Sequence, residues 1–236
     1  MNDYTGQIIE IQLERYKNAS ALIRLPAKTV PGPGQYLQAN LPGNSDEVLP
    51  TSLFLSGLDI GIGSAAKNDV SLWGNLPDDW EAGSSLAFRG PLGTGFSLPK
   101  DLKHLALIAA GKSSGRLLPL IAPALQVSAE ITVLSDKRSA NLPLEVEQRP
   151  LDASAEARNW ADFLAIDIPS EQAEGIADLV GLDRDFPGKI RGQVLLSSEM
   201  PCGALAQCGI CSVRIGSKDV FVCENGPVFS LSEFSF

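Results

Sequence analysis

The chain has 236 residues, of which 44% are hydrophobic and 20% are charged, and its formal net charge at pH 7 is −9. This composition is typical of a globular chain that buries a substantial core in one large or two modest domains. The negative charge would repel a phosphate backbone, and the sequence offers no lysine or arginine cluster to overcome it locally, so nucleic acid is excluded as an expected partner.

The first residues, MNDYTGQIIEIQLERYKN, carry charges where a signal peptide needs an uninterrupted apolar core, and no segment approaches the length of a membrane span. We therefore expect a cytoplasmic protein without a membrane span. The four cysteines all follow residue 201, a distribution that does not suit a disulfide framework, and a reducing cytoplasm would oppose such bridges. The cysteines predict metal or redox chemistry instead.

The first hundred residues predict an antiparallel β-barrel. They contain short alternating or β-branched runs, each separated from the next by Gly, Pro, Asn or Asp, and this spacing is typical of barrel strands. Two glycine-dense segments, residues 31–43 and 90–99, predict tight turns or a close approach of the backbone to a ligand. The expected strands lie in the runs GQIIEIQLERY, SALIRLPAK, DVSLWGNL and SSLAFRG.

A Rossmann-like α/β unit is expected over residues 101–198, with the segment LPKDL at 98–102 as the domain boundary. Residues 104–125 contain an apolar strand, a turn of small residues and a helical stretch, which is how an α/β unit begins. Residues 139–160 have no clear periodicity, and we assign no element to them. Further strands are expected at 130–138, 161–169 and 192–198, and a helix at 170–182 with Ser170 as its N-cap.

Four cysteines, Cys202, Cys208, Cys211 and Cys223, form the pattern C-x5-C-x2-C-x11-C, with glycine and alanine frequent between them. Small residues let backbone N–H groups come close enough to donate to sulfur, and such donors tune the potential of an iron–sulfur cluster. Zinc sites usually contain two short C-x2-4-C knuckles, and here only Cys208 and Cys211 form one. The pattern therefore favours an iron–sulfur cluster over zinc or over four inert, buried thiols.

The run MPCGALAQCGICSV, followed by FVCENGPVF, resembles the C-terminal [2Fe–2S] segment of the electron-transfer subunit of class B dihydroorotate dehydrogenase. PGQYLQ (33–38) and GPLGTGF (90–96) resemble that family's PGQFV and GPLGNGF segments. The first cysteine gap is one residue longer than in plant-type ferredoxins and equals that of adrenodoxin-type ferredoxins. The similarity spans nearly the whole chain, in the order barrel, α/β unit and a cluster segment over residues 199–236.

This resemblance implies a ferredoxin-reductase-like subunit of an oxidoreductase of pyrimidine biosynthesis, with FAD on the barrel and nicotinamide on the α/β unit. It also implies a [2Fe–2S] cluster, held by the four cysteines, that passes electrons to the flavin of a partner dehydrogenase.

Two of the family's motifs are altered. The flavin motif Arg-x-Tyr/Phe-Ser/Thr corresponds to VLPTSLFLSG (48–57), which has no arginine, and the glycine-rich phosphate loop corresponds to AAGKSSGRLLPL (109–120), where Lys112 and Arg116 add positive charge. We therefore expect FAD to bind weakly if at all, and NAD(P) not to be used. The candidate cofactor contacts are Thr51, Ser52, Gly90, Gly93, Thr94, Gly111 and Gly115.

Other conspicuous residues are interpreted as structural. The three tryptophans are expected to pack in the core, His104 to begin an apolar strand without acting as a base, and Asp162 and Asp167 to flank a strand end as solvated charges. The tryptophans are Trp73, Trp80 and Trp160.

Two functions remain as hypotheses. The first is an iron–sulfur electron-transfer subunit that works beside a flavoprotein dehydrogenase, whose flavin splits electron pairs into single electrons. The second is a non-catalytic binding or assembly module that keeps the reductase fold and uses the cluster as a structural or sensing element. In the first hypothesis the partner docks over the cysteine loop around Leu205, although its small residues could equally pack against the chain's own barrel.

Overall fold

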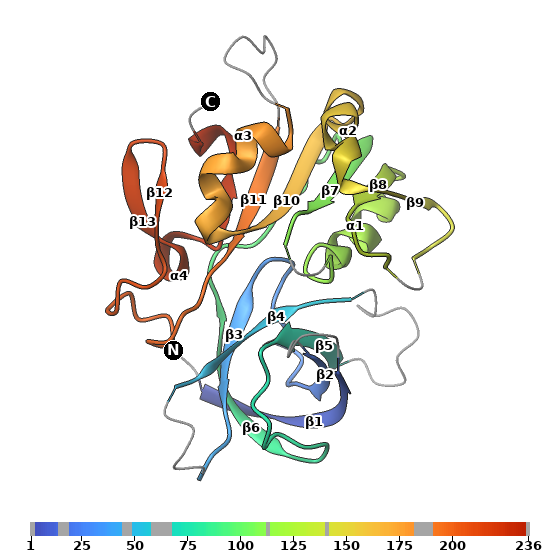
Figure 1. The fold of residues 1–236 in the computed structure, drawn as a ribbon. Helices are drawn as coiled ribbons and strands as arrows, with labels where there is room; N and C mark the ends of the chain where they lie inside the picture. Colours follow the sequence, from blue (N-terminus) through green and yellow to red (C-terminus); the bar gives the residue numbers. More distant parts are fainter. Residues whose placement is uncertain are drawn as a thin grey trace.

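The computed structural model describes residues 3–13, 19–43, 49–57, 68–111, 114–139, 142–181 and 191–234. The predicted barrel is confirmed: six antiparallel strands close in the order β1-β2-β5-β4-β3-β6 (Figure 1). Its interior is built by alternate residues of these strands, because successive side chains of a strand point to opposite faces. The strands are β1 (Asp3–Leu13), β2 (Ala19–Arg24), β3 (Tyr36–Asn40), β4 (Thr51–Leu55), β5 (Asp69–Gly74) and β6 (Ser85–Leu92).

One outward face of the barrel is also buried. Leu37, Leu53 and Leu72 belong to the core inside the barrel, whereas Tyr36 and Phe54 belong to a second core shared with the rest of the molecule. Register places Tyr36 opposite Phe54, Gln38 opposite Ser52, and Phe54 opposite Trp73. We call these five residues, Tyr36, Gln38, Ser52, Phe54 and Trp73, the outer barrel face.

The predicted α/β unit is a six-stranded sheet in the order β14-β11-β10-β7-β8-β9, in which only β14 is antiparallel to its neighbour among the described strands. Its two central strands are apolar except for His104 at the start of one and Asp167 near the end of the other, as expected for parallel strands covered on both faces. No helix in the described chain is long and apolar enough to cross a bilayer. The strands are β7 (His104–Ala109), β8 (Glu130–Leu134), β9 (Val146–Arg149), β10 (Phe163–Pro169), β11 (Gly192–Ser197) and β14 (Val228–Ser230).

Short helices connect these strands. Two regions differ from the expectations. Residues 139–160, to which no element was assigned, contain β9, η2 and α2. The helical segment after β10 begins as a 3-10 helix with Pro169 as its N-cap residue and without a side-chain cap bond. Ser170 is therefore the first helical residue and not the N-cap, because Pro169 already holds the extended cap conformation. The helices are η1 (Leu118–Leu120), α1 (Ile121–Gln126), η2 (Leu151–Ala153), α2 (Ser154–Trp160), η3 (Ser170–Gly175) and α3 (Ile176–Leu179).

The cysteine-containing segment packs against the barrel and pairs with the edge of the α/β sheet. After β11 it forms the hairpin of β12 (Ser212–Ile215) and β13 (Lys218–Phe221), then α4 (Val222–Asn225), and it returns to the sheet edge as β14 before η4 (Leu231–Glu233). In Figure 1 this red segment lies against the β11 edge of the sheet, above the barrel. Met200, Cys211, Cys223 and Phe229 share one core with Tyr36 of the barrel.

Candidate functional site

The cysteine loop, residues 202–211, has an unusual backbone. Gly203, Ala204, Ala206 and Gly209 have φ values of 64°, 62°, 55° and 75°. Alanine adopts this left-handed conformation at a cost of roughly 1–2 kcal/mol, so the surrounding structure must hold it in place. A loop wound in this way can turn several N–H groups toward one point.

Those N–H groups point at cysteine sulfurs. The backbone amides of Gln207, Leu205 and Cys208 donate to the Cys202 sulfur, and these bonds, that from Gln207 first, lower the pKa of Cys202 to about 6. The amide of Ala206 donates to Cys223, but burial outweighs it and raises the pKa of Cys223 to about 12. The loop thus supplies the N–H donors that an anionic sulfur cluster requires.

The four thiols lie in two close pairs. The Sγ atoms of Cys211 and Cys223 are 3.2 Å apart and buried, and Cys202 is hydrogen-bonded to Cys208, which is exposed. Within the described chain, no three His, Cys, Asp or Glu side chains converge to hold a single metal ion. A [2Fe–2S] cluster takes two cysteines on each iron, and the two pairs match that number of ligands.

The barrel supports this segment. The Tyr36 hydroxyl donates to the Cys223 carbonyl oxygen at 3.1 Å, and burial raises the pKa of Tyr36, which keeps the hydroxyl protonated as a donor. A Cβ on Gly203 would lie 2.9 Å from Pro50 and 3.5 Å from Nη2 of Arg89. The cysteine loop therefore rests on the outer side of the barrel.

Two predicted cofactor residues, Gly93 and Thr94, contact the C-terminal segment. The Thr94 amide donates to the Gly226 carbonyl at 2.7 Å, and its hydroxyl donates to the Val228 carbonyl at 2.7 Å. Gly93 has φ +75°, and a Cβ there would lie 2.5 Å from Pro227. The GPLGTGF segment thus docks the GPVF segment, a contact across more than 130 residues that the sequence analysis did not foresee.

The barrel contacts expected for FAD are largely used within the protein. The Ser52 hydroxyl accepts a hydrogen bond from Gln38 Nε2 at 2.8 Å, Thr51 pairs with Ala39 in the sheet, and a Cβ on Gly90 would lie 2.8 Å from Leu37. Two polar atoms of the outer barrel face, Gln38 Oε1 and Trp73 Nε1, have no hydrogen-bond partner among the described residues.

Arg116 covers the remaining part of the outer barrel face. Its guanidinium lies 5.3 Å from the Phe54 ring centroid and 4.9 Å from that of Trp73. Its Nε and Nη2 donate to the two carboxylate oxygens of Asp167 at 2.8 and 2.7 Å. Arg116 is 3% exposed and Asp167 is fully buried, so the expectation that Asp167 is a solvated charge is wrong. Burial raises the pKa of Asp167, and the Arg116 charge opposes that shift.

The expected phosphate loop faces this ion pair. A Cβ on Gly111 would lie 3.5 Å from both Arg116 Nη2 and Asp167 Oδ1. The Gly115 carbonyl accepts a hydrogen bond from the Gly57 amide at 3.0 Å, which ties the loop to the barrel, while Lys112 lies outside the described residues. A pyrophosphate needs an uncompensated positive charge, and Asp167 neutralises Arg116. The residues at this junction therefore do not fit FAD or a nicotinamide dinucleotide.

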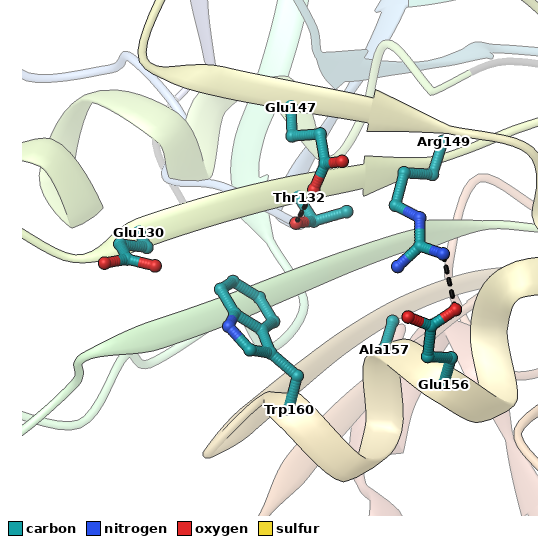
Figure 2. Close-up of a pocket in the computed structure, with 7 residues that line it drawn as sticks. All are labelled: Glu130, Thr132, Glu147, Arg149, Glu156, Ala157 and Trp160. Carbon is teal, nitrogen blue, oxygen red and sulfur yellow. Dashed lines mark hydrogen bonds and ion pairs between the residues drawn. The ribbon is translucent and has the colours of Figure 1, made fainter.

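A shallow cavity of about 190 Å³ lies at the opposite edge of the sheet, between β8, β9 and α2 (Figure 2). Arg149 pairs with Glu156, and Thr132 donates to Glu147 at 3.3 Å. Trp160 lines this cavity, is 36% exposed and lies 4.9 Å from the His104 ring, so the expectation that Trp160 is a core residue is wrong. Trp80 is confirmed in the barrel core, and His104 begins β7 as predicted.

A closed antiparallel barrel followed by a mainly parallel α/β sheet defines the ferredoxin-reductase-like fold class. Three solved structures share it. An NADH-dependent reduced ferredoxin–NADP oxidoreductase, studied for flavin-based electron bifurcation, aligns with a TM-score of 0.72 and 16% identity over 98% of this chain and 89% of its own.

The CS–b5R domains of human Ncb5or in the NAD+ form give a TM-score of 0.60 at 15% identity, over 82% of this chain and 69% of theirs. Phthalate dioxygenase reductase, described as a modular structure for electron transfer from pyridine nucleotides to [2Fe–2S], gives a TM-score of 0.56 at 14% identity, over 84% of this chain and 70% of its own. No protein-family model matches the sequence. At these identities the likeness establishes the fold alone.

Proposed function

We propose that this chain is an electron-transfer protein that holds a [2Fe–2S] cluster and exchanges electrons with a flavoprotein dehydrogenase of the dihydroorotate dehydrogenase type. In this proposal residues 1–100 form the barrel domain, 101–198 the nicotinamide-domain-like unit, and 199–236 the cluster segment. The ligands are Cys202, Cys208, Cys211 and Cys223.

The proposal rests on the direction of the backbone N–H groups in the cysteine loop, which point at cysteine sulfurs. Amides from Leu205 to Cys208 donate to two of the four sulfurs, and Ala204 and Ala206 hold left-handed backbone to allow it. Strain of this kind persists where the surrounding structure and the site require it. Inert thiols would gain little from such donors, whereas they stabilise the negative charge of sulfur bound to iron.

When bound, a [2Fe–2S] cluster supplies one-electron redox chemistry. The chain's own residues hold it and control access: Cys211 and Cys223 form the buried side of the site, and Cys208 the exposed side. Leu205 and Ile210 are 51% and 59% exposed on the loop, and Leu49 is 54% exposed beside Pro50, which contacts Gly203. This apolar rim suits the core of a protein interface close to the redox group.

Since dehydrogenation moves two electrons and the cluster one at a time, the partner must carry a flavin that can split the pair. Fold likeness to reductases supports an electron-transfer role, and the resemblance of the cysteine segment supports the dehydrogenase partner.

Anaerobic purification of the full chain, with iron, acid-labile sulfide, zinc and flavin quantified per chain, tests the proposal. We expect about two iron and two sulfide per chain and an absorption band that bleaches with dithionite. Stoichiometric zinc without sulfide would refute it. An intact cluster that exchanges no electrons with any flavoprotein dehydrogenase would favour the binding or assembly module instead.

A further inference from the structure

One buried side chain bridges the barrel and the α/β unit at their junction. Arg116 leaves the loop after β7, and its guanidinium packs on Phe54 of β4 and Trp73 of β5 while it binds Asp167 of β10. A single group therefore contacts two barrel strands and the central sheet. In Figure 1 the β4–β5 side of the barrel lies directly below the β7–β10 part of the sheet.

One backbone hydrogen bond crosses the same junction: the Gly57 amide, after β4, donates to the Gly115 carbonyl. Within the sheet, the Ala110 amide donates to the Asp167 carbonyl, so Asp167 is held by its main chain and by both carboxylate oxygens. The Gly57–Gly115 bond brings the segments expected to hold the flavin and the phosphate into direct contact with each other.

We infer that Arg116 takes the place of a dinucleotide cofactor at this junction, so that the chain binds neither FAD nor NAD(P) and its two units are joined by the Arg116–Asp167 pair. The faces of Phe54 and Trp73 that a flavin ring could stack on are covered by the guanidinium. The charge that a pyrophosphate could bind is compensated by Asp167. Gln38 Oε1 and Trp73 Nε1 could offer one acceptor and one donor, which is too little to hold a dianionic pyrophosphate.

A consequence follows that rests on the proposed function. With no flavin in this chain, electrons enter and leave through the cysteine loop alone, so the chain is a one-electron relay and the partner supplies all two-electron chemistry.

A cofactor site and a structural lock respond in opposite ways to loss of Arg116. If Arg116 served a cofactor, the wild type would bind FAD and Arg116→Ala would weaken that binding. If Arg116 locks the junction, the wild type binds no FAD, FMN or NADH at about 100 µM in equilibrium dialysis, and Arg116→Ala lowers the melting temperature by roughly 10 °C. The matched control is Arg191→Ala, because Arg191 also donates two hydrogen bonds to one carboxylate, that of Asp101, but on the surface.

Each outcome decides the inference. Stoichiometric FAD in the wild type, or an unchanged melting temperature in Arg116→Ala, overturns it. If Arg116→Ala does not fold, the double variant Arg116→Met/Asp167→Leu is tested, because it keeps the packing and removes both charges. We expect this variant to fold and to bind no flavin. If it binds flavin, or if it does not fold, the inference is overturned. Iron and sulfide content are measured separately from flavin binding. A chain that holds both flavin and a cluster refutes only the inference about Arg116. A chain that holds neither flavin nor a cluster refutes only the proposed function.

Discussion

The cysteine loop and the barrel junction differ in where their polar groups point. In the cysteine loop, backbone amides aim at thiols, and exposed leucine and isoleucine surround them. At the junction, the guanidinium of Arg116 and the carboxylate of Asp167 satisfy each other, and the aromatic rings are covered. Both regions lie where the sequence resembles motifs of one family. The comparison teaches that donors directed at a common point favour a ligand site, whereas polar groups that find their partners within the chain argue against one.

The largest effect is expected at the cysteines. Replacing Cys202 or Cys208 by Ser should abolish or strongly lower the cluster content, because each thiolate is a proposed iron ligand. Iron and sulfide analysis with visible spectroscopy measures the loss. Cluster content equal to that of the wild type in either variant would contradict the assignment of that ligand.

At the junction, Asp167→Ala should destabilise the protein by about 3–5 kcal/mol, because it leaves the Arg116 charge buried without a partner. Denaturant unfolding measures the change. Asp101→Ala removes the partner of Arg191 on the surface, where a pair contributes about 0–1 kcal/mol, and is the control. Equal effects of the two variants would show that burial of the Arg116–Asp167 pair is not what matters.

The contact between Gly93 and the C-terminal segment gives the next largest effect. Gly93→Ala should cost about 2–4 kcal/mol, because the added Cβ combines a left-handed φ with a 2.5 Å approach to Pro227. Gly83 has φ +93° and nothing within 4 Å of its Cβ position, so Gly83→Ala measures the conformational cost alone. The difference between the two unfolding free energies isolates the docking contact, and a difference near zero would argue against it.

The smallest effect concerns the partner. Leu205→Glu should weaken the complex with a flavoprotein dehydrogenase by about tenfold, since a charge enters an apolar interface core, while iron and sulfide stay at wild-type levels. Val127, which is 49% exposed beyond α1, provides the control Val127→Glu. Affinity is measured by co-purification and titration. An unchanged affinity would move the docking surface elsewhere, and a lost cluster would mean that Leu205 packs within the loop.

The barrel and most sheet strands were predictable because their apolar residues alternate or run continuously. The strand β9 was missed because it is a short edge strand in which only Val146 is buried, and α2 because it buries only Ser154 and Ala157. These elements are placed by their neighbours and not by their own periodicity.

The spacing of the cysteines predicts the candidate site. The left-handed backbone of Ala204 and Ala206 in the cysteine loop has no signal in the sequence. The burial of Asp167 was not predictable, because its partner lies 51 residues earlier and the pairing depends on how the two units pack. The contacts of Gly93 and Thr94 with the C-terminal segment were not predictable for the same reason. A glycine-rich segment predicts that something comes close to the backbone, and here that neighbour is the chain's own residues 226–228.

The strand β14 limits how this chain would exchange electrons in the proposed function. Because it is hydrogen-bonded to β11 and follows directly on α4, the cysteine segment cannot swing on a tether between a donor and an acceptor. A fixed cysteine segment would serve one docked protein at a time, so the donor and the acceptor of the proposed function would have to alternate on the same surface or meet it from two sides. Turnover would then follow the collision frequency and residence time of the visiting proteins, and lengthening a linker within this chain would not accelerate it.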